Sequence, residues 1–311
     1  MTKQDLLDTY NRVKPYVHNT PILTSRLVNE HVEAQVYFKC ENFQRAGAYK
    51  IRGATNAIMQ LSEDQKKNGV VTHSSGNFAQ ALSLAAKSLG IKAYIVMPSN
   101  APKVKREAVL EYGGEIIECE PTIEARQHAA DEIVKSTGAT FIHPSNHPDV
   151  ILGQGTAAYE LLEKIPDLDY IICPVGGGGL IAGTALVGTY FSEHCKVIGT
   201  EPFEADDAYR SLISGKIESN ITANTIADGL RTQLGSHNFP IIKEHVSEII
   251  RVTENDIIEA MKFIWERMKI IIEPSSAVAF AGVVKQESQF KNKKIGVIIS
   301  GGNVDVTNLP F

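Results

Sequence analysis

The sequence predicts an α/β protein made of two interleaved units, each with a parallel β-sheet flanked by helices. From residue 70 to residue 144, runs rich in β-branched residues alternate with segments of helical periodicity, an order that is typical of parallel sheets. The alternation restarts between residues 153 and 202, and no long flexible linker separates the two stretches. Because a chain of 311 residues is long for a single core, we expect a small domain at 69–146 inserted into a large domain made of 1–68 and 147–311.

The first unit contains strands and helices in unbroken alternation. The predicted strands lie at 70–74, 92–98, 115–120 and 139–144. The predicted helices lie at 77–90, 102–114 and 122–138. Apolar residues recur at helical spacing in the segment 77–90, namely Phe78, Ala81, Leu82, Ala85 and Leu89. Gly90, at the end of this segment, is the stop signal of the predicted helix.

The second unit repeats this order around a run of glycines. A helix is predicted at 153–166 and another at 180–195, and strands are predicted at 169–175 and 196–202. Further along the chain, Thr253 and Asp256 have the spacing of a capping box that opens a helix at 254–268. A last strand at 295–300 runs into the polar loop SGGN.

The composition describes an ordinary soluble protein. Hydrophobic residues make up 43% of the chain, charged residues 22%, and the net charge is -5, so nothing attracts it electrostatically to nucleic acid. No apolar stretch is long enough to span a bilayer, and the first residues lack the apolar core of a signal peptide. Four well-separated cysteines fit free thiols in a reducing compartment, so we expect a cytoplasmic protein; these are Cys40, Cys119, Cys173 and Cys195.

The glycine run predicts an anion site. Gly176, Gly177, Gly178 and Gly179 connect a strand to a helix, where backbone N–H groups and the helix dipole favour a phosphate. A dinucleotide is the alternative guest, since the run also satisfies G-x-G-x-x-A and Glu201 ends the next strand. An NAD-dependent oxidoreductase therefore stays open at this point.

Two further loops and one lysine carry polar groups of interest. The loop with Ser74, Ser75, Gly76 and Asn77 precedes a helix and suits a carboxylate, although Ser75 or Asn77 could equally be a plain helix cap. Ser300 lies in the turn after the last strand. Lys50 follows Tyr49 at the start of an apolar-periodic segment. Taken alone, that segment favours a surface charge, and the alternative is a buried amine kept for covalent chemistry.

Taken together, these segments resemble one family across nearly the whole chain, from residue 18 to residue 305. It is the serine racemase and serine/threonine dehydratase group of pyridoxal-phosphate (PLP) enzymes, which have fold type II, the architecture of the tryptophan synthase β subunit. The motifs that carry the resemblance occur in the family's order: ENFQRAGAYKIRGA, HSSGNFAQAL, PVGGGGLIAG, TEPFEADDAYRS, TIADGLRTQLG, WERMKIIIEPSSA and SGGNVD.

The resemblance implies a role for each of these polar residues. Lys50 corresponds to the lysine that binds PLP covalently and takes the substrate's α-proton, with Tyr49 packed beside the ring. The four glycines would hold the phosphate. Asn77 would meet the ring hydroxyl, and Ser300 the ring nitrogen. The loop from Ser74 to Asn77 would bind the substrate, and Ser75 would be the acid or base on the opposite face, which racemisation requires.

The implied activity is a serine racemase that also dehydrates serine to pyruvate and ammonia. A threonine or 3-hydroxyaspartate dehydratase without a significant racemase role is the alternative within the family, and a ligand-binding relative without turnover is a third hypothesis. Phe78, and the pair of Ala48 and Tyr49, depart from the family's usual residues and leave substrate preference open. EPSSA at 273–277 is interpreted as the scaffolding of a helix start.

The resemblance also implies a metal and an oligomeric state. Glu201, Asp207 and the main-chain carbonyl of Ala205 match the family's divalent-cation site. Such oxygen ligands suit Mg²⁺, Mn²⁺ or Ca²⁺. A homodimer acting on a small amino acid is the expected assembly.

Overall fold

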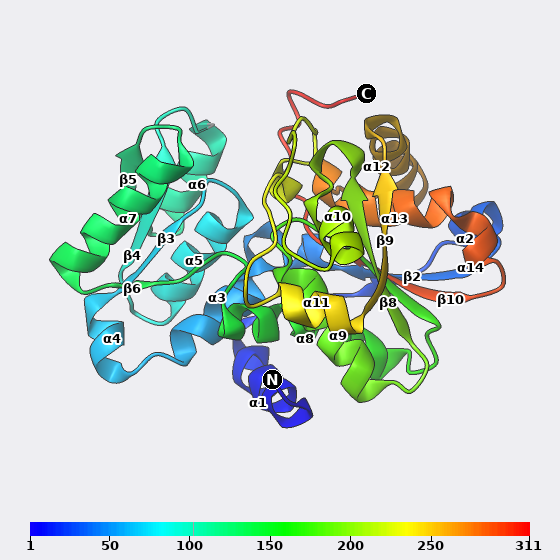
Figure 1. Cartoon of the computed structure of the whole chain (residues 1–311), viewed down its shortest axis with the longest axis horizontal. Helices are drawn as coiled ribbons and strands as arrows, with labels where there is room; N and C mark the ends of the chain where they lie inside the picture. Colours follow the sequence, from blue (N-terminus) through cyan, green and yellow to red (C-terminus); the bar gives the residue numbers. More distant parts are fainter. Residues whose placement is uncertain (102) are drawn as a thin grey trace.

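Two β-sheets lie in two lobes of the computed structural model, which describes residues 1–101 and 103–311 (Figure 1). The larger sheet has the order β1 (Ile22–Leu23), β2 (Gln35–Cys40), β10 (Lys294–Ile299), β7 (Tyr170–Pro174), β8 (Lys196–Pro202) and β9 (Val246–Val252). The smaller sheet has the order β5 (Glu115–Cys119), β4 (Ala93–Pro98), β3 (Val70–His73) and β6 (Thr140–Phe141). Neighbouring strands are parallel except for β1, which is antiparallel to β2. The predicted fold class is confirmed.

Helices cover both faces of the smaller sheet, which contains the strands of residues 70–141. One face packs against α3 (Lys50–Met59), α5 (Asn77–Ser88) and α6 (Lys103–Glu111). The other face packs against α7 (Ile123–Thr137). The predicted helix at 102–114 begins on Pro102, which lies outside the described residues. The domain bounds at 68/69 and 146/147 stay a prediction.

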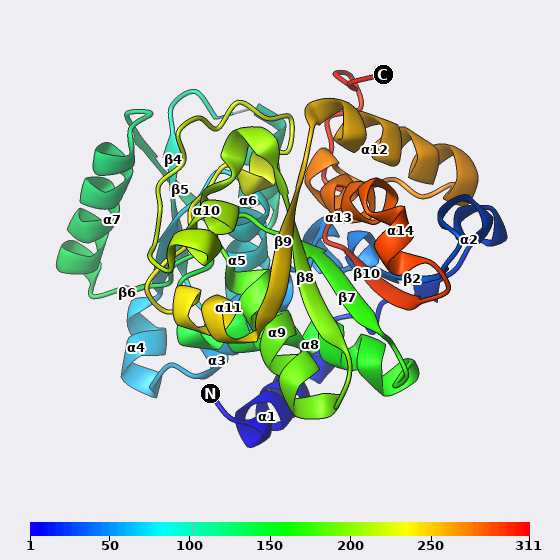
Figure 2. The ribbon, with the colours of Figure 1, turned by 45° about the vertical axis from the view of Figure 1, so that its right-hand side comes forward.

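The larger sheet is also a central layer between two groups of helices (Figure 2). One group consists of α1 (Lys3–Val13), α8 (Pro148–Lys164), α9 (Gly179–Phe191), α10 (Asp207–Ser214) and α11 (Phe239–His245). The other consists of α2 (Arg26–Val32), α12 (Glu254–Met268), α13 (Pro274–Lys285) and α14 (Glu287–Phe290). The short α4 (Glu63–Asn68) leads into β3. None of the described helices is long and apolar enough to cross a membrane.

The start of α12 follows its local sequence signal, whereas α8 begins at Pro148, before the predicted helix at 153–166, and three strands were not predicted. Thr253 and Asp256 form the predicted capping box at the start of α12. Strands β1, β2 and β9 are absent from the sequence prediction. β9 is an edge strand whose partly exposed Glu248 and Arg251 interrupt its apolar residues, so it lacks the continuous apolar run of the central strands.

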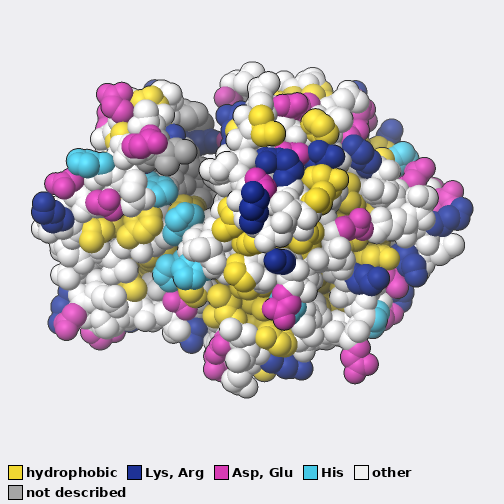
Figure 3. All heavy atoms as spheres, viewed as in Figure 1, with side chains coloured by type: hydrophobic (Ala, Val, Ile, Leu, Met, Phe, Trp, Pro, Cys, Tyr) yellow, Lys and Arg dark blue, Asp and Glu magenta, His cyan; other side chains and the backbone are white. Residues whose placement is uncertain are grey.

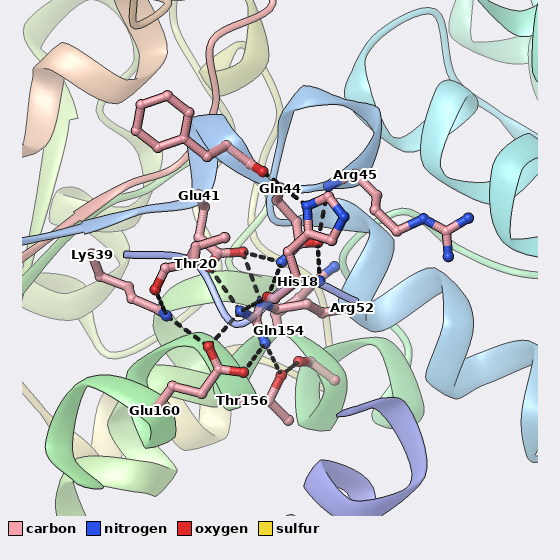
Figure 4. A network of polar contacts seen from close by, with 12 residues as sticks. His18, Thr20, Lys39, Glu41, Gln44, Arg45, Arg52, Gln154, Thr156 and Glu160 are labelled. Carbon is pink, nitrogen blue, oxygen red and sulfur yellow. Dashed lines mark hydrogen bonds and ion pairs between the residues drawn. The ribbon is translucent and has the colours of Figure 1, made fainter. Parts of the chain in front are cut away.

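A buried cluster of charges connects α3 to β2 and α8 of the larger lobe (Figure 4). The guanidinium of Arg52 contacts Glu41 at 2.7 Å and Glu160 at 2.7 Å. Lys39 on β2 donates to Glu160 at 2.6 Å. The side chains of all four residues are at most 2% exposed. Two positive and two negative charges therefore balance in a buried site, where an unpaired charge is costly.

We predict that Glu160→Ala strongly destabilises the protein. The substitution leaves Arg52 and Lys39 with one carboxylate between them, and removing one partner of a buried pair costs about 3–5 kcal/mol. Denaturant unfolding of the purified variant measures this loss. Asp64→Ala, which breaks the exposed pair with Lys67, is the matched control and should leave the free energy of unfolding nearly unchanged. Equal effects of the two substitutions would contradict a stabilising role for the cluster.

Candidate active site

The candidate residues lie at the carboxyl ends of parallel strands, where ligands bind in open α/β sheets. The loop from Ser74 to Asn77 follows β3, the glycine run follows β7, and Ser300 follows β10. Tyr49, which precedes Lys50, donates its backbone N–H to the Ser300 carbonyl at 3.0 Å. This hydrogen bond joins the start of α3 to the end of β10.

Lys50 begins α3 and is partly buried. Its ammonium donates to the backbone carbonyl of Pro144 at 3.3 Å and lies 5.0 Å from the centre of the Tyr49 ring. Burial lowers the pKa of Lys50 to about 8, although the nearby Glu273 carboxylate acts in the opposite direction. Lys50 is therefore a desolvated amine, and the surface-charge interpretation of its segment is wrong.

The glycine run forms a cradle that side chains would fill. Gly178 has a left-handed φ of 80° and caps α9 without a side-chain hydrogen bond. A Cβ on Gly177 would lie 2.3 Å from Ser145 Oγ, and one on Gly179 would lie 2.8 Å from the Ser145 carbonyl oxygen. The start of α9 is thus free of a capping side chain, so its first backbone N–H groups remain available to an anion.

Asn238 holds this cradle in place. Its side-chain amide donates to the Gly177 carbonyl at 2.8 Å, and its Oδ1 accepts from the Gly235 backbone N–H at 2.9 Å. Asn238 belongs to a segment with few periodic apolar residues, so no local pattern in the sequence indicates this role.

The side chains of the loop after β3 do not cap the helix that follows it. Gly76 is the N-cap of α5 and makes no side-chain capping bond. The interpretation of Ser75 or Asn77 as a plain helix cap is therefore wrong. Ser74, Ser75 and Asn77 are partly exposed, and Ser74 Oγ accepts from the Gly76 N–H at 3.4 Å.

A buried carboxylate that the sequence analysis missed orients Asn77. Asn77 Nδ2 lies 2.9 Å and 3.0 Å from the two carboxylate oxygens of Glu273. Its Oδ1 accepts from Asn303 Nδ2 at 2.9 Å. Burial raises the pKa of Glu273 to about 7. α13 does begin at Pro274 as predicted, but the EPSSA segment also contacts the site. Acids before helices are common, so nothing in the sequence distinguishes Glu273 from an ordinary helix start.

Phe78 does not line the site. Its side chain is 2% exposed and packs in the core of the smaller lobe, among residues of α3, α5 and β4. The departure of this residue from the family pattern therefore changes the core of that lobe rather than the lining of the site.

Histidines gather close to the boundary between the two lobes (Figure 3). His143 Nδ1 accepts from the backbone N–H groups of Ser145 at 3.1 Å and Asn146 at 2.9 Å. Burial, with help from His73 and Lys50, lowers the pKa of His143 to about 4. A neutral His143 therefore fixes the loop that contacts both Lys50 and the glycine run.

The predicted cation ligands lie apart from Lys50, at the end of β8 and the start of α10. Asp207 Oδ1 is buried without a hydrogen-bond partner, and its Oδ2 accepts from the Leu234 N–H at 2.9 Å. Burial raises the pKa of Asp207 to about 6, and burial with the charge of Asp207 raises the pKa of Glu201 well above its usual range. Among residues 1–101 and 103–311, no group of three or more His, Cys, Asp or Glu side chains is arranged to hold a metal ion.

We predict that Lys50 reacts with amine-acylating reagents at lower pH than the other lysines. Only the neutral amine is nucleophilic, so the labelling rate of Lys50 in the apoprotein should rise with a midpoint near pH 8. The exposed Lys92, whose pKa is raised by its hydrogen bond with Glu115, is the internal control, and its rate should rise at higher pH than that of Lys50. Peptide mapping by mass spectrometry follows both residues in one sample. A common midpoint for the two would contradict the desolvation of Lys50.

Comparisons with known proteins agree with this geometry. The model of the family described as "Pyridoxal-phosphate dependent enzyme" matches residues 13–301. A serine racemase of Dictyostelium discoideum is 49% identical over 99% of this chain and 97% of its own. A beta-hydroxyaspartate dehydratase of Paracoccus denitrificans is 46% identical over 100% of this chain and 98% of its own.

The architecture agrees as well. A crystal structure of the Dictyostelium discoideum serine racemase superposes with a TM-score of 0.95, covering 98% of this chain and 99% of that one. Because the family match spans most of the chain, the comparisons support PLP rather than a dinucleotide as the cofactor. The chain belongs to the pyridoxal-phosphate dependent enzymes of fold type II.

Proposed function

We propose that this chain is a serine racemase that also dehydrates serine to pyruvate and ammonia. The observation that supports the proposal is the position of two candidate proton-transfer residues on two separate elements. Lys50 begins α3, and Ser75 lies in the loop after β3, within the smaller sheet. Racemisation needs a base on one face of the α-carbon and an acid on the other, and these two residues would supply both.

PLP, when bound, withdraws electrons from the substrate's α-carbon and so acidifies its α-proton. The remaining steps belong to the chain. Lys50, with its lowered pKa, would hold the cofactor and then accept that proton. Ser75 would deliver a proton from the opposite side. The loop from Ser74 to Asn77 would hold the substrate carboxylate through hydroxyl, amide and backbone donors.

The remaining contacts would orient the cofactor. The N–H groups of Gly176 to Gly179 would bind the phosphate, because no side chain caps the start of α9 and accepts from them. Asn77, fixed by Glu273, would donate to the ring hydroxyl. Tyr49 would pack against the ring, and Ser300 would hydrogen-bond the ring nitrogen.

A 3-hydroxyaspartate dehydratase is the second candidate. The relative from Paracoccus denitrificans carries that name, and its identity to this chain is close to that of the serine racemase. Both activities begin with removal of the α-proton by Lys50, and they differ in the step after this removal. Substrate preference must therefore be measured with both compounds.

We further propose that a divalent cation binds at Glu201, Asp207 and the Ala205 carbonyl. The support is chemical. The pKa values of both buried carboxylates are raised, and Oδ1 of Asp207 is buried without a hydrogen-bond partner. The negative charge of the ionised carboxylates would therefore lack a compensating positive charge. A hard cation with bound waters would supply it. The homodimer and the cytoplasmic location stay predictions.

We predict that Mg²⁺ raises the melting temperature and that a chelator lowers it. Cation binding to the folded state contributes about 2.7 kcal/mol at a concentration 100 times the dissociation constant. Asp207→Asn should abolish the response to Mg²⁺. Asp305→Asn, at an exposed carboxylate, should keep it. An unchanged response in the Asp207 variant would rule this site out.

We predict that Ser75→Ala abolishes racemisation and spares dehydration of L-serine. Loss of one acid/base group lowers a proton-transfer rate by about 10²–10⁴-fold, and only racemisation uses Ser75. The assay incubates enzyme with L-serine, D-serine, L-threonine and threo-3-hydroxyaspartate and follows keto acid and chirality. Parallel loss of both activities would mean that Ser75 has another role. Keto acid from 3-hydroxyaspartate without racemisation of serine in the wild type would favour the second candidate.

A further inference from the structure

Asn303, the last residue of the SGGN loop, joins three segments of the chain. Its Nδ2 donates to the Ala46 backbone carbonyl at 2.8 Å and to Asn77 Oδ1 at 2.9 Å. Ala46 precedes the start of α3, and Asn77 begins α5 in the smaller lobe. Because a side-chain amide has two N–H bonds, both donors of Asn303 are used in these two contacts.

The contact with Ala46 fixes which end of the Asn303 amide carries the hydrogens. A backbone carbonyl can only accept, so Nδ2 rather than Oδ1 of Asn303 must face Ala46. Ala46 has a left-handed φ of 58°, a conformation that is costly for alanine. A Cβ on Gly47 would lie 2.2 Å from Asn303 Oδ1. The backbone at 46–47 therefore determines both the position and the orientation of Asn303.

The fixed Asn303 amide in turn fixes the amide of Asn77. Because Asn303 presents an N–H, Asn77 must face it with Oδ1. Asn77 Nδ2 then faces Glu273, whose carboxylate oxygens accept from it at 2.9 Å and 3.0 Å. The reversed amide would place the N–H groups of the two asparagines against each other and would leave both without an acceptor there.

Asn303 is decisive because the hydrogen-bonding capacity of Glu273 changes near neutral pH. Burial raises the pKa of Glu273 to about 7. An ionised carboxylate only accepts, whereas a protonated one can also donate and would then tolerate either orientation of the Asn77 amide. The Asn303 amide does not titrate. It therefore excludes the reversed orientation in both protonation forms of Glu273.

One N–H of Asn77 remains for a ligand. The two acceptors on Glu273 belong to a single carboxylate, so they lie on the same side of Asn77 Nδ2, and one N–H bond is shared between them. Among residues 1–101 and 103–311, no other acceptor contacts Asn77 Nδ2. Reversal of the amide would put an oxygen in the place of this free N–H.

We propose that Asn303 is a positioning residue that selects the orientation of the Asn77 amide, so that Asn77 meets the ring hydroxyl of PLP as a donor. This inference rests on the proposed contact between Asn77 and that hydroxyl. It adds that the contact depends on a residue of the larger lobe that does not itself touch the cofactor. A donor stabilises an ionised hydroxyl, whereas an oxygen in its place would repel it.

The test compares PLP with 3-deoxypyridoxal 5′-phosphate, which lacks the ring hydroxyl. Calorimetric titration of the apoprotein gives the dissociation constant of each compound. The measured quantity is the preference for PLP, defined as the dissociation constant of the analogue divided by that of PLP. Effects on the phosphate, on Lys50 or on general packing act on both compounds and cancel in this ratio.

Asn303→Asp keeps the size of the side chain but replaces its donors with acceptors. The new carboxylate competes with Glu273 for the N–H groups of Asn77, so the preference for PLP should fall by roughly 10-fold, the order of one hydrogen bond to a charged group. Asn303→Ala should lower the preference by less, because Glu273 then orients Asn77 alone. Asn308→Asp, the same change at an exposed residue of the same terminal segment, should leave the preference unchanged.

Asn77→Ala separates this inference from the contact on which it rests. It should lower the preference for PLP at least as much as Asn303→Asp does. If Asn77→Ala lowers the preference and neither Asn303 variant does, the inference is overturned and the contact of Asn77 stands. If Asn77→Ala leaves the preference unchanged, the proposed contact with the ring hydroxyl fails, and the inference with it. Equal losses of affinity for both compounds in the Asn303 variants would mean that Asn303 only packs.

Discussion

The pairing of Arg52 with Glu41 and Glu160 is the interaction on which the position of Lys50 depends. Arg52 lies two residues after Lys50, in the first turn of the same helix, and its guanidinium is fully buried. It pairs with both carboxylates, while Lys39 supplies the second positive charge. Because neither arginine nor glutamate tolerates burial alone, the four side chains fix α3 against β2 and α8. Because Lys50 is the first residue of α3, the position of this helix also fixes the position of the Lys50 side chain.

The same helix lies between the lobes and so sets the geometry of the site. Its apolar residues belong to the core of the smaller lobe, while a Cβ on Gly153 of α8 would lie 2.5 Å from the Cα of Gly53. Close backbone approach on one side and apolar packing on the other hold α3 between the lobes, with the Lys50 ammonium at the Pro144 carbonyl near the strand ends. The contacts of Asn77 with Glu273 and Asn303 bring the loop after β3 to this region from the opposite lobe. The site is therefore assembled from two sheets rather than carried by one.

The sequence predicted the parts of this arrangement that have local signals. The capping box of α12, the glycine run after β7 and the alternating strands of the smaller lobe each depend on a few adjacent residues, and the structure confirms them. Contacts between distant segments could not be predicted in this way. Glu273 and Ser276 looked like a helix start, since nothing adjacent to them marks their partners at Asn77 and Ser300. Phe78 illustrates the converse, because a departure next to a site motif proved to be a core residue.

The proposed chemistry depends most on Lys50 as the residue that holds the cofactor. Borohydride reduction of the PLP-loaded enzyme, followed by peptide mapping, identifies the lysine that carries the cofactor. We expect a single modified peptide containing Lys50, and loss of the visible cofactor band in Lys50→Ala. A modified lysine elsewhere, or a band that survives in the Lys50→Ala variant, would contradict this role.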